Sequence, residues 1–347
     1  MKKNIFNMYN ISLARSFLYG LAILWIMFFH SGIPVTTPVL SWIKSHGNCG
    51  VDIFFLLSGI SLYFSYTKNR NLKKFYINRF LKILPIYLFI YTIFFAYKNI
   101  GHGSFKAFIL QLTTLDFFLN GLGPVPWFVP AIIVFYLVYP LLYKIFFDEY
   151  KNKEFGVGAT VIAVFVIYCV LRATRPYLEI MYERFAVMLL GVLLGRMVFN
   201  KQEIKLWQVL VCVLLFVSTL MLHTFYKSYN IRCVFYVFMS LMFVYLFSLV
   251  YNFNKKFLKW MNVIIGFIGG FTLEIYLIHE RFQEYFIKIL RGGGITISYS
   301  GPLYQFSCII LSIALAVALG SLFNFVIKKI KTRKSKKEPE TNSKPQQ

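Results

Sequence analysis

Long runs of apolar residues alternate with short polar segments along the whole chain. Most runs have about the length that an α-helix needs to cross the hydrocarbon core of a bilayer. The pattern predicts an all-α integral membrane protein of about ten transmembrane helices, with no soluble domain left between them. The ten predicted spans lie near residues 17–34, 49–67, 83–97, 127–147, 155–172, 183–199, 206–224, 232–251, 262–280 and 301–327.

Two places interrupt this regular pattern. The third predicted span is short and is expected to open at Pro85, while residues 106–122 form a candidate re-entrant or interfacial helix before the "GPVPW" turn. At the start of the chain, the first apolar run follows Arg15 and has no small-residue cleavage site after it. We therefore interpret this run as a retained span and not as a signal peptide.

Composition and charge agree with a membrane protein. Of the 347 residues, 58% are hydrophobic and only 14% are charged, and Lys and Arg outnumber Asp and Glu by 37 to 13. The basic residues cluster in short segments between spans, which is typical of membrane topology and argues against nucleic-acid binding. Their distribution predicts that both termini are cytoplasmic. The predicted membrane domain covers residues 1–330, and residues 331–347 form a basic, disordered tail.

The five cysteines are scattered and show no metal-ligand spacing. Neither a disulfide framework nor a metal site is predicted.

His30 ends the apolar run "LWIMFFH", in the outer half of the bilayer when Arg15 lies at the inner end. An ionisable residue at that depth usually faces the interior of the bundle or a wet cavity and serves a function. His30 is therefore the candidate catalytic residue; the alternative is a histidine hydrogen-bonded in the packing or at the interface. Asp52 enters the next span on the same side and is the candidate orienting partner of His30, or else a helix cap.

A basic stretch follows the second span. In it Arg79 and Lys82 lie three residues apart, on one face of a helix beside the membrane. Two interpretations stay open: attraction to anionic lipid head groups, or a specific site for phosphate groups.

Three later stretches also place polar side chains at membrane depth, and the predicted topology brings several of them to the outer half. Trp127 is a candidate substrate contact or a residue of the interfacial aromatic belt. Arg184 is a candidate substrate contact or a structural ion-pair partner. His279 and Glu280 complete the set of candidate substrate-binding residues.

Six motifs together resemble the membrane-bound acyltransferase 3 family, whose members include bacterial polysaccharide O-acyltransferases. They occur in family order and span most of the chain: "GLAILWIMFFH" ending at His30, "GNCGVDIFFLLSG" (47–59), "FYINRFLKILPIY" (75–87), "WFV" at Trp127, "RFAVMLLGVLLG" from Arg184 and "YLIH" ending at His279.

The resemblance implies an enzyme of the inner membrane that moves an acyl group, usually acetyl, from cytoplasmic acyl-coenzyme A to a hydroxyl of an extracytoplasmic or lipid-linked glycan. It implies that His30 is catalytic and that Arg79 and Lys82 help to bind the donor. The sequence departs from the family at Tyr19, where the family often has an arginine, and Arg15 is the candidate replacement. Lys82 stands where a second arginine is common, and it lacks the bidentate fork.

Expected partners are the glycan acceptor, membrane lipids and proteins of glycan synthesis or export. Two other functions remain open. One is a transporter or flippase of polysaccharide or lipid-linked sugar, with the intramembrane ionisable residues as its pathway. The other is a non-catalytic subunit of a glycan-export complex.

Overall fold

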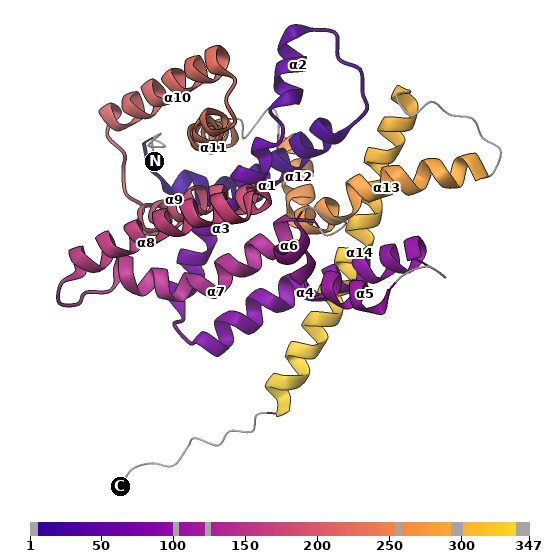
Figure 1. Cartoon of the computed structure of the whole chain (residues 1–347), viewed down its shortest axis with the longest axis horizontal. Coiled ribbons are helices and arrows are strands. Elements are labelled where there is room, and N and C mark those ends of the chain that lie inside the picture. The colour runs from indigo at the N-terminus through magenta and orange to yellow at the C-terminus, as the bar shows by residue number, and fades with distance from the viewer. Residues whose placement is uncertain (1–5, 100–103, 122–125, 254–258, 293–300, 338–347) are drawn as a thin grey trace.

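The computed structural model describes residues 6–99, 104–121, 126–253, 259–292 and 301–337 and is helical almost throughout (Figure 1). The α-helices are α1 (Tyr9–His30), α2 (Pro38–Ser45), α3 (Cys49–Lys68), α4 (Leu72–Asn99), α5 (Phe105–Leu112), α6 (Leu115–Asn120), α7 (Phe128–Phe147), α8 (Lys153–Thr174), α9 (Glu179–Phe199), α10 (Leu206–Tyr226), α11 (Tyr229–Phe253), α12 (Lys259–Ile268), α13 (Thr272–Gly292) and α14 (Pro302–Lys337). Two short 3₁₀ helices, η1 (Pro176–Leu178) and η2 (Gly269–Phe271), precede α9 and α13.

The helices match the ten predicted spans. Among the described residues, nine helical segments are long and apolar enough to cross a membrane. They are α1, α3, α4, α7, α8, α10, α11, the α12–α13 segment and α14. The tenth predicted span is α9, which carries four charged residues and packs along α3. The all-α membrane fold is therefore confirmed.

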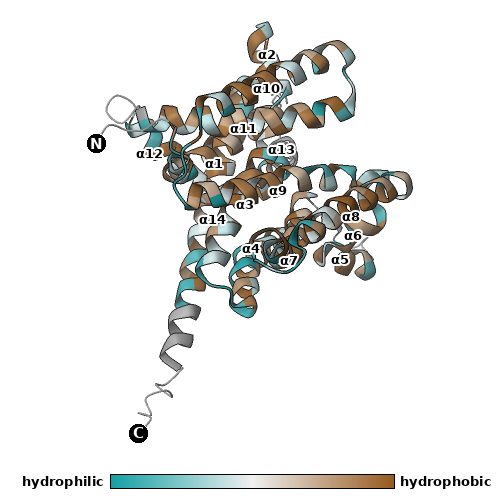
Figure 2. Ribbon diagram, turned by 90° about the vertical axis from the view of Figure 1, so that its left-hand side faces the viewer, coloured by the Kyte–Doolittle hydropathy of each residue, from teal (hydrophilic) through white to brown (hydrophobic). Residues whose placement is uncertain are grey.

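Helices α3 and α9 pack backbone to backbone at the centre of the bundle. A Cβ added to Gly59 would lie 2.4 Å from the carbonyl oxygen of Met188, and one added to Gly191 would lie 2.2 Å from that of Leu56. Only glycine permits this approach, which is common between membrane helices. Most of α3 is buried, whereas α8 has no buried residue and is hydrophobic over much of its length (Figure 2).

The structure corrects two expectations about span boundaries. Pro85 does not open a span but lies inside α4, so the basic stretch and the third span are one continuous helix. Membrane helices tolerate such a proline because neighbouring groups re-satisfy the freed backbone carbonyl. The ninth span is divided by η2 into α12 and α13, and a Cβ on Gly269 would meet the carbonyl oxygen of Ser16 at 1.8 Å. This close contact with α1 explains why glycine stands at the break.

The described start of the chain and the connections α3–α4, α7–α8 and α9–α10 meet at one end of the bundle, here named the basic end. Asn7 forms a β-bridge with Glu203, and Arg70 is ion-paired with Asp148 at 2.9 Å. His30 and the start of α3 at Cys49 lie toward the opposite ends of their helices, here named the histidine end. Helix α1 ends at the histidine end and α3 begins there, so the two helices cross the bundle in opposite directions.

Two short helices, α5 and α6, precede α7. Residues 106–122 contain α5 and α6, both too short to span a bilayer, as expected of a re-entrant or interfacial segment. Helix α14 continues to Lys337, so the first part of the predicted disordered tail is helical, and residues 338–347 lie outside the described residues.

Candidate active site

The ring of His30 lies against the ring of His279 at the histidine end. The Nδ1 atom of His30 is 3.0 Å from the Nε2 atom of His279, and the ring centroids are 5.2 Å apart. His30 closes α1, while His279 lies within α13 and is only 1% exposed. The sequence assigned these residues separately, and the structure brings them into one hydrogen-bonded pair.

The hydrogen bonds of His279 determine which nitrogen of His30 is free. The Nδ1 atom of His279 lies 2.9 Å from the carbonyl oxygen of Tyr276 and 3.1 Å from that of Ile275. Because carbonyl oxygens only accept, this nitrogen carries the proton. For two neutral rings, His279 Nε2 then accepts a hydrogen bond that His30 Nδ1 donates. The lone pair of His30 is left on Nε2, which has no partner among the described residues.

The chain after His30 is fixed to two other helices. The backbone N–H of Gly32 donates to Gln305 Oε1 on α14 at 2.8 Å, and Lys44 Nζ donates to the carbonyl oxygen of Ile33 at 2.6 Å. These contacts hold the end of α1 in place, so the free nitrogen of His30 has a defined position.

Asp52 does not contact His30. Its Oδ1 atom lies 3.5 Å from Arg184 Nε, and both side chains are buried. The sequence predicted that Asp52 orients His30, and the structure corrects this contact, because α9 places a guanidinium beside Asp52 and α13 supplies His279 instead. Arg184 also lies over the ring of Trp127, with 5.2 Å from Cζ to the centroid. The ion-pair alternative for Arg184 agrees with these contacts.

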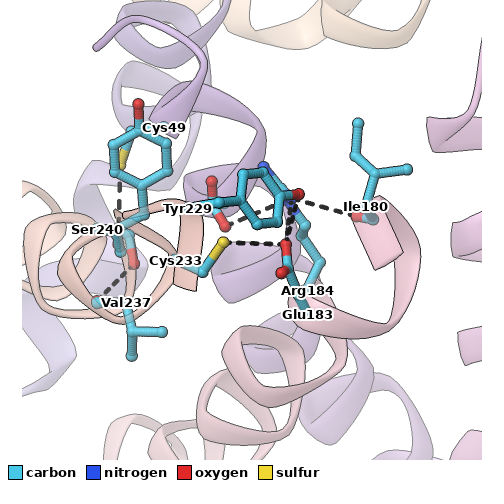
Figure 3. Close-up of polar contacts among 10 residues, drawn as sticks. Cys49, Ile180, Glu183, Arg184, Tyr229, Cys233, Val237 and Ser240 are labelled. Atoms are coloured by element: carbon cyan, nitrogen blue, oxygen red, sulfur yellow. Dashed lines mark hydrogen bonds and ion pairs between the residues drawn. The ribbon is translucent and has the colours of Figure 1, made fainter. Parts of the chain in front are cut away.

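A second set of contacts around Arg184 was not assigned from the sequence (Figure 3). Glu183 Oε2 accepts hydrogen bonds from Tyr229 at 2.9 Å, Cys233 at 3.0 Å and Arg184 at 3.3 Å. Tyr229 and Cys233 belong to α11, so this network joins α9 to α11. The only signal in the sequence was the adjacent Glu183 and Arg184 at the start of a span.

A cavity of about 520 Å³ opens among α1, α3, α4, α7, η2, α13 and α14. Four cationic side chains line it, Arg15, Lys68, Arg79 and Lys82, together with one carboxylate, Glu274. None of the four cations is ion-paired within the part of the chain that the structure describes. The three candidate donor-binding residues, Arg15, Arg79 and Lys82, are therefore brought to one site, and Tyr19 lines the same cavity.

The cavity runs along much of the thickness of the bundle. On α3 its lining extends from Lys68 to Phe54, which is about 21 Å at the rise of an α-helix. At the deep end it reaches Tyr276, whose ring centroid is 5.8 Å from that of His279. The cavity thus leads from the basic end to within one helical turn of the histidine pair.

Glu280 and Trp127 do not line the cavity. Glu280 is exposed at the residue after His279, and Trp127 is half-buried at the start of α7. No group of three or more His, Cys, Asp or Glu side chains that could hold a metal ion occurs among the described residues.

Comparison with known proteins identifies the family. A family model described as an acyltransferase domain matches residues 17–321, which is most of the chain. No curated protein and no solved structure matches the chain. The matched residues include the histidine pair, the buried ion pair and the whole of η2. The chain therefore belongs to the acyltransferase 3 family and is a multi-pass membrane acyltransferase.

Proposed function

We propose that this acyltransferase moves a short acyl group, such as acetyl, from cytoplasmic acyl-coenzyme A to a hydroxyl of a glycan on the other side of the membrane. One observation carries the proposal: the cavity leads from four cations that have no ion-pair partner among the described residues to an aromatic ring beside the histidine pair. A donor with an anionic head and a long, nearly neutral arm fits such a cavity.

The head of the donor is placed at the basic end. Arg15, Lys68, Arg79 and Lys82 supply positive charge for its phosphate groups. The Nε atom of Arg79 is buried without a hydrogen-bond partner among the described residues, which is costly unless a ligand supplies one. Arg79 offers a planar fork for phosphate, whereas Lys82 offers a point charge.

The arm of the donor follows the cavity toward His30. A length of about 21 Å along α3 lets the thioester approach the histidine end while the charged head stays at the basic end. No phosphate then has to enter the apolar part of the bundle, where an unpaired charge costs several kcal/mol or more.

The chemistry uses the free nitrogen of His30. Nε2 takes the proton of the acceptor hydroxyl while the hydroxyl oxygen attacks the thioester carbonyl carbon. The tetrahedral intermediate collapses, the C–S bond breaks, and the proton returns from Nε2 to the departing thiolate. The products are the ester and free coenzyme A. An acyl-histidine relay, in which Nε2 attacks first, uses the same nitrogen.

The other candidate residues support this site. We propose that Asp52 and Arg184 position α3 and α9 and hold Trp127 near the histidine end, so that they act on the acceptor side indirectly. His279 holds the tautomer of His30, and exposed Glu280 is placed to meet the acceptor. No step in this mechanism needs a metal.

The basic end faces the cytoplasm in this proposal, because positively charged segments are retained inside. This orientation puts both termini in the cytoplasm. We place the protein in the inner membrane of a bacterial envelope because the family resemblance implies it. Proteins of glycan synthesis or export are its proposed partners.

A transporter of glycan or lipid-linked sugar is the second candidate. The broken ninth span at η2 favours it, since transporters bind substrates at discontinuous helices. Transporters of that kind usually carry paired breaks in two halves, and the described residues show one. Loss of glycan export, rather than loss of its ester groups, is the outcome that favours transport.

The test compares two histidines at the histidine end. Cells that lack the protein are complemented with wild type, His30→Gln or His46→Gln at matched membrane levels, and ester-linked acyl groups on surface glycans are measured. His46 is the matched control because it pairs with His223 (Nε2 to Nε2, 3.3 Å) and does not line the cavity. We expect wild type and His46→Gln to restore the esters and His30→Gln to fail. Equal restoration by both variants contradicts the proposal.

A further inference from the structure

Three aromatic side chains line the deep end of the cavity, on the side toward the histidine pair. They are Phe54 on α3, Phe128 on α7 and Tyr276 on α13, and each is less than 10% exposed. The ring centroids of Phe54 and Phe128 are 6.1 Å apart, and those of Phe128 and Tyr276 are 5.2 Å apart. Phe128 therefore packs between Phe54 and Tyr276, and the three rings, here named the aromatic constriction, come from three helices.

The aromatic constriction lies between the cavity and the histidine pair. On one side lies the cavity of about 520 Å³, with its hydroxyl and cationic lining. On the other side His279 follows directly, 5.8 Å from Tyr276 between ring centroids, and His30 lies a further 5.2 Å beyond it. The rings of Tyr276, His279 and His30 thus follow one another in contact distance, and the constriction stands between this row and the cavity.

We propose that the aromatic constriction sets the length of acyl group that this enzyme transfers and keeps water from the thioester. The inference rests on the proposed function and assigns specificity to Phe54, Phe128 and Tyr276. With the arm between the three rings and the carbonyl carbon at His30 Nε2, a two-carbon acyl group needs little further space, whereas a longer tail is confined together with the arm against the rings. Tight apolar pockets discriminate about 10- to 200-fold for each methylene group.

The hydroxyl of Tyr276 adds a polar contact at this point. It makes no hydrogen bond among the described residues, although the cavity that it lines contains a run of serines on α3. A hydroxyl in that position can donate to a carbonyl oxygen of the arm as it passes the constriction. The ring and the hydroxyl of Tyr276 therefore have separate effects, on chain length and on donor positioning.

The experiment uses the full-length protein in detergent or proteoliposomes with acetyl-, butyryl- and hexanoyl-coenzyme A. The variants are Phe54→Leu and Phe128→Leu, which widen the constriction, and Phe55→Leu is the matched control. Phe55 neighbours Phe54, is fully buried and packs on Phe128 at 5.1 Å, yet it does not line the cavity. Two rates of coenzyme A release are measured: one with a surface-glycan extract of cells that lack the protein as acceptor, and one without acceptor, which reports hydrolysis of the donor.

We expect the ratio of hexanoyl to acetyl transfer to rise about tenfold or more in Phe54→Leu and Phe128→Leu, together with donor hydrolysis, and to stay at the wild-type value in Phe55→Leu. The inference is overturned if wild type transfers acetyl and hexanoyl equally, or if folded Phe54→Leu and Phe128→Leu keep the wild-type ratio. If one variant does not accumulate, the other decides. A wild type that transfers no acyl group contradicts the proposed function itself, so the two failures are distinct.

Discussion

The imidazoles of His30 and His279 form a hydrogen bond of 3.0 Å, although 249 positions separate them in the sequence. His279 donates from Nδ1 to backbone carbonyl groups of its own helix and so offers Nε2 to His30. This arrangement makes His279 a positioning residue, which acts through the tautomer and orientation of His30.

Replacing His279 by Phe removes the acceptor for His30 Nδ1. We expect acyl transfer to fall by as much as the roughly 10²–10⁴-fold that a positioned base contributes. His279→Gln keeps an amide oxygen that can accept, so we expect a smaller loss and a shifted pH–rate profile. Steady-state rates of both variants across pH test this. A variant that loses stability but keeps its rate and pH profile shows that His279 is merely structural.

Replacing Arg79 by Ala removes a guanidinium from the lining of the cavity. We expect KM for acetyl-coenzyme A to rise about 10- to 100-fold with a small change in kcat, as for the loss of a hydrogen bond to a charged group. The exposed Lys73 on the same helix does not line the cavity, so Lys73→Ala is the control. Equal effects of the two variants on KM contradict a specific donor site and favour general attraction to anions.

The buried pair of Asp52 and Arg184 makes a prediction for stability. Asp52→Leu alone leaves Arg184 with less compensation, and we expect a loss of about 3–5 kcal/mol. The double variant Asp52→Leu/Arg184→Leu is expected to lose less than the sum of the single variants. Thermal unfolding in detergent measures this. The pair of exposed Arg70 and half-buried Asp148 is the control, for which Arg70→Ala costs about 0–1 kcal/mol.

The histidine end also predicts a dependence of stability on pH. Burial holds the pKa of His46, at the end of α2, below its usual 6.5, and nearby Arg232 lowers it further, while a hydrogen bond to the carbonyl oxygen of Trp42 opposes both effects. A lowered pKa in the folded state favours the neutral ring. The contribution of neutral His46 to the free energy of unfolding is therefore complete above about pH 6.5 and is lost as the pH falls through the lowered pKa.

Thermal unfolding of wild type and His46→Gln between pH 7.5 and pH 5 measures this effect. We expect the unfolding midpoint of wild type to fall more steeply with acidification. A proton added to His46 Nε2 would also face His223 Nε2, since these two nitrogens are 3.3 Å apart. Parallel curves for the two proteins contradict the prediction.

Two glycines predict opposite effects of the same substitution. In Gly59→Ala the new methyl group meets the backbone of α9 at 2.4 Å, so we expect a loss of about 1–3 kcal/mol from overpacking. In Gly158→Ala nothing lies within 4 Å, and we expect a gain of about 0.5–1 kcal/mol from helix propensity. Unfolding midpoints in detergent compare the two variants. A loss in both shows that α8 packs more closely than the structure indicates.

The sequence predicted the spans well because the hydropathy and the length of an apolar run are enough to identify a membrane helix. It placed His30 from its depth after Arg15, and it selected Arg15, Arg79 and Lys82, which line one cavity. The contact partners of the polar side chains were less predictable, since residue spacing along one helix does not determine which distant helix packs against it. Asp52 was therefore assigned to His30, although α9 supplies its partner.

The break at η2 was missed for a related reason. Gly269 and Gly270 look like ordinary small residues of a membrane helix, and only the close approach to Ser16 on α1 gives the pair its meaning. Pro85 gave the opposite error, since a proline that would end a helix in water lies inside one here.

Helix α8 has no buried residue, whereas most of α3 is buried. Lipid accommodates apolar side chains of many shapes, so the positions of α8 are constrained by little more than hydrophobicity. Exchanging one of its apolar residues for another is therefore expected to have almost no effect on fitness. Most side chains of α3, in contrast, pack against several neighbouring residues at once. The amino-acid sequence of α8 is thus expected to change much faster during evolution than that of α3.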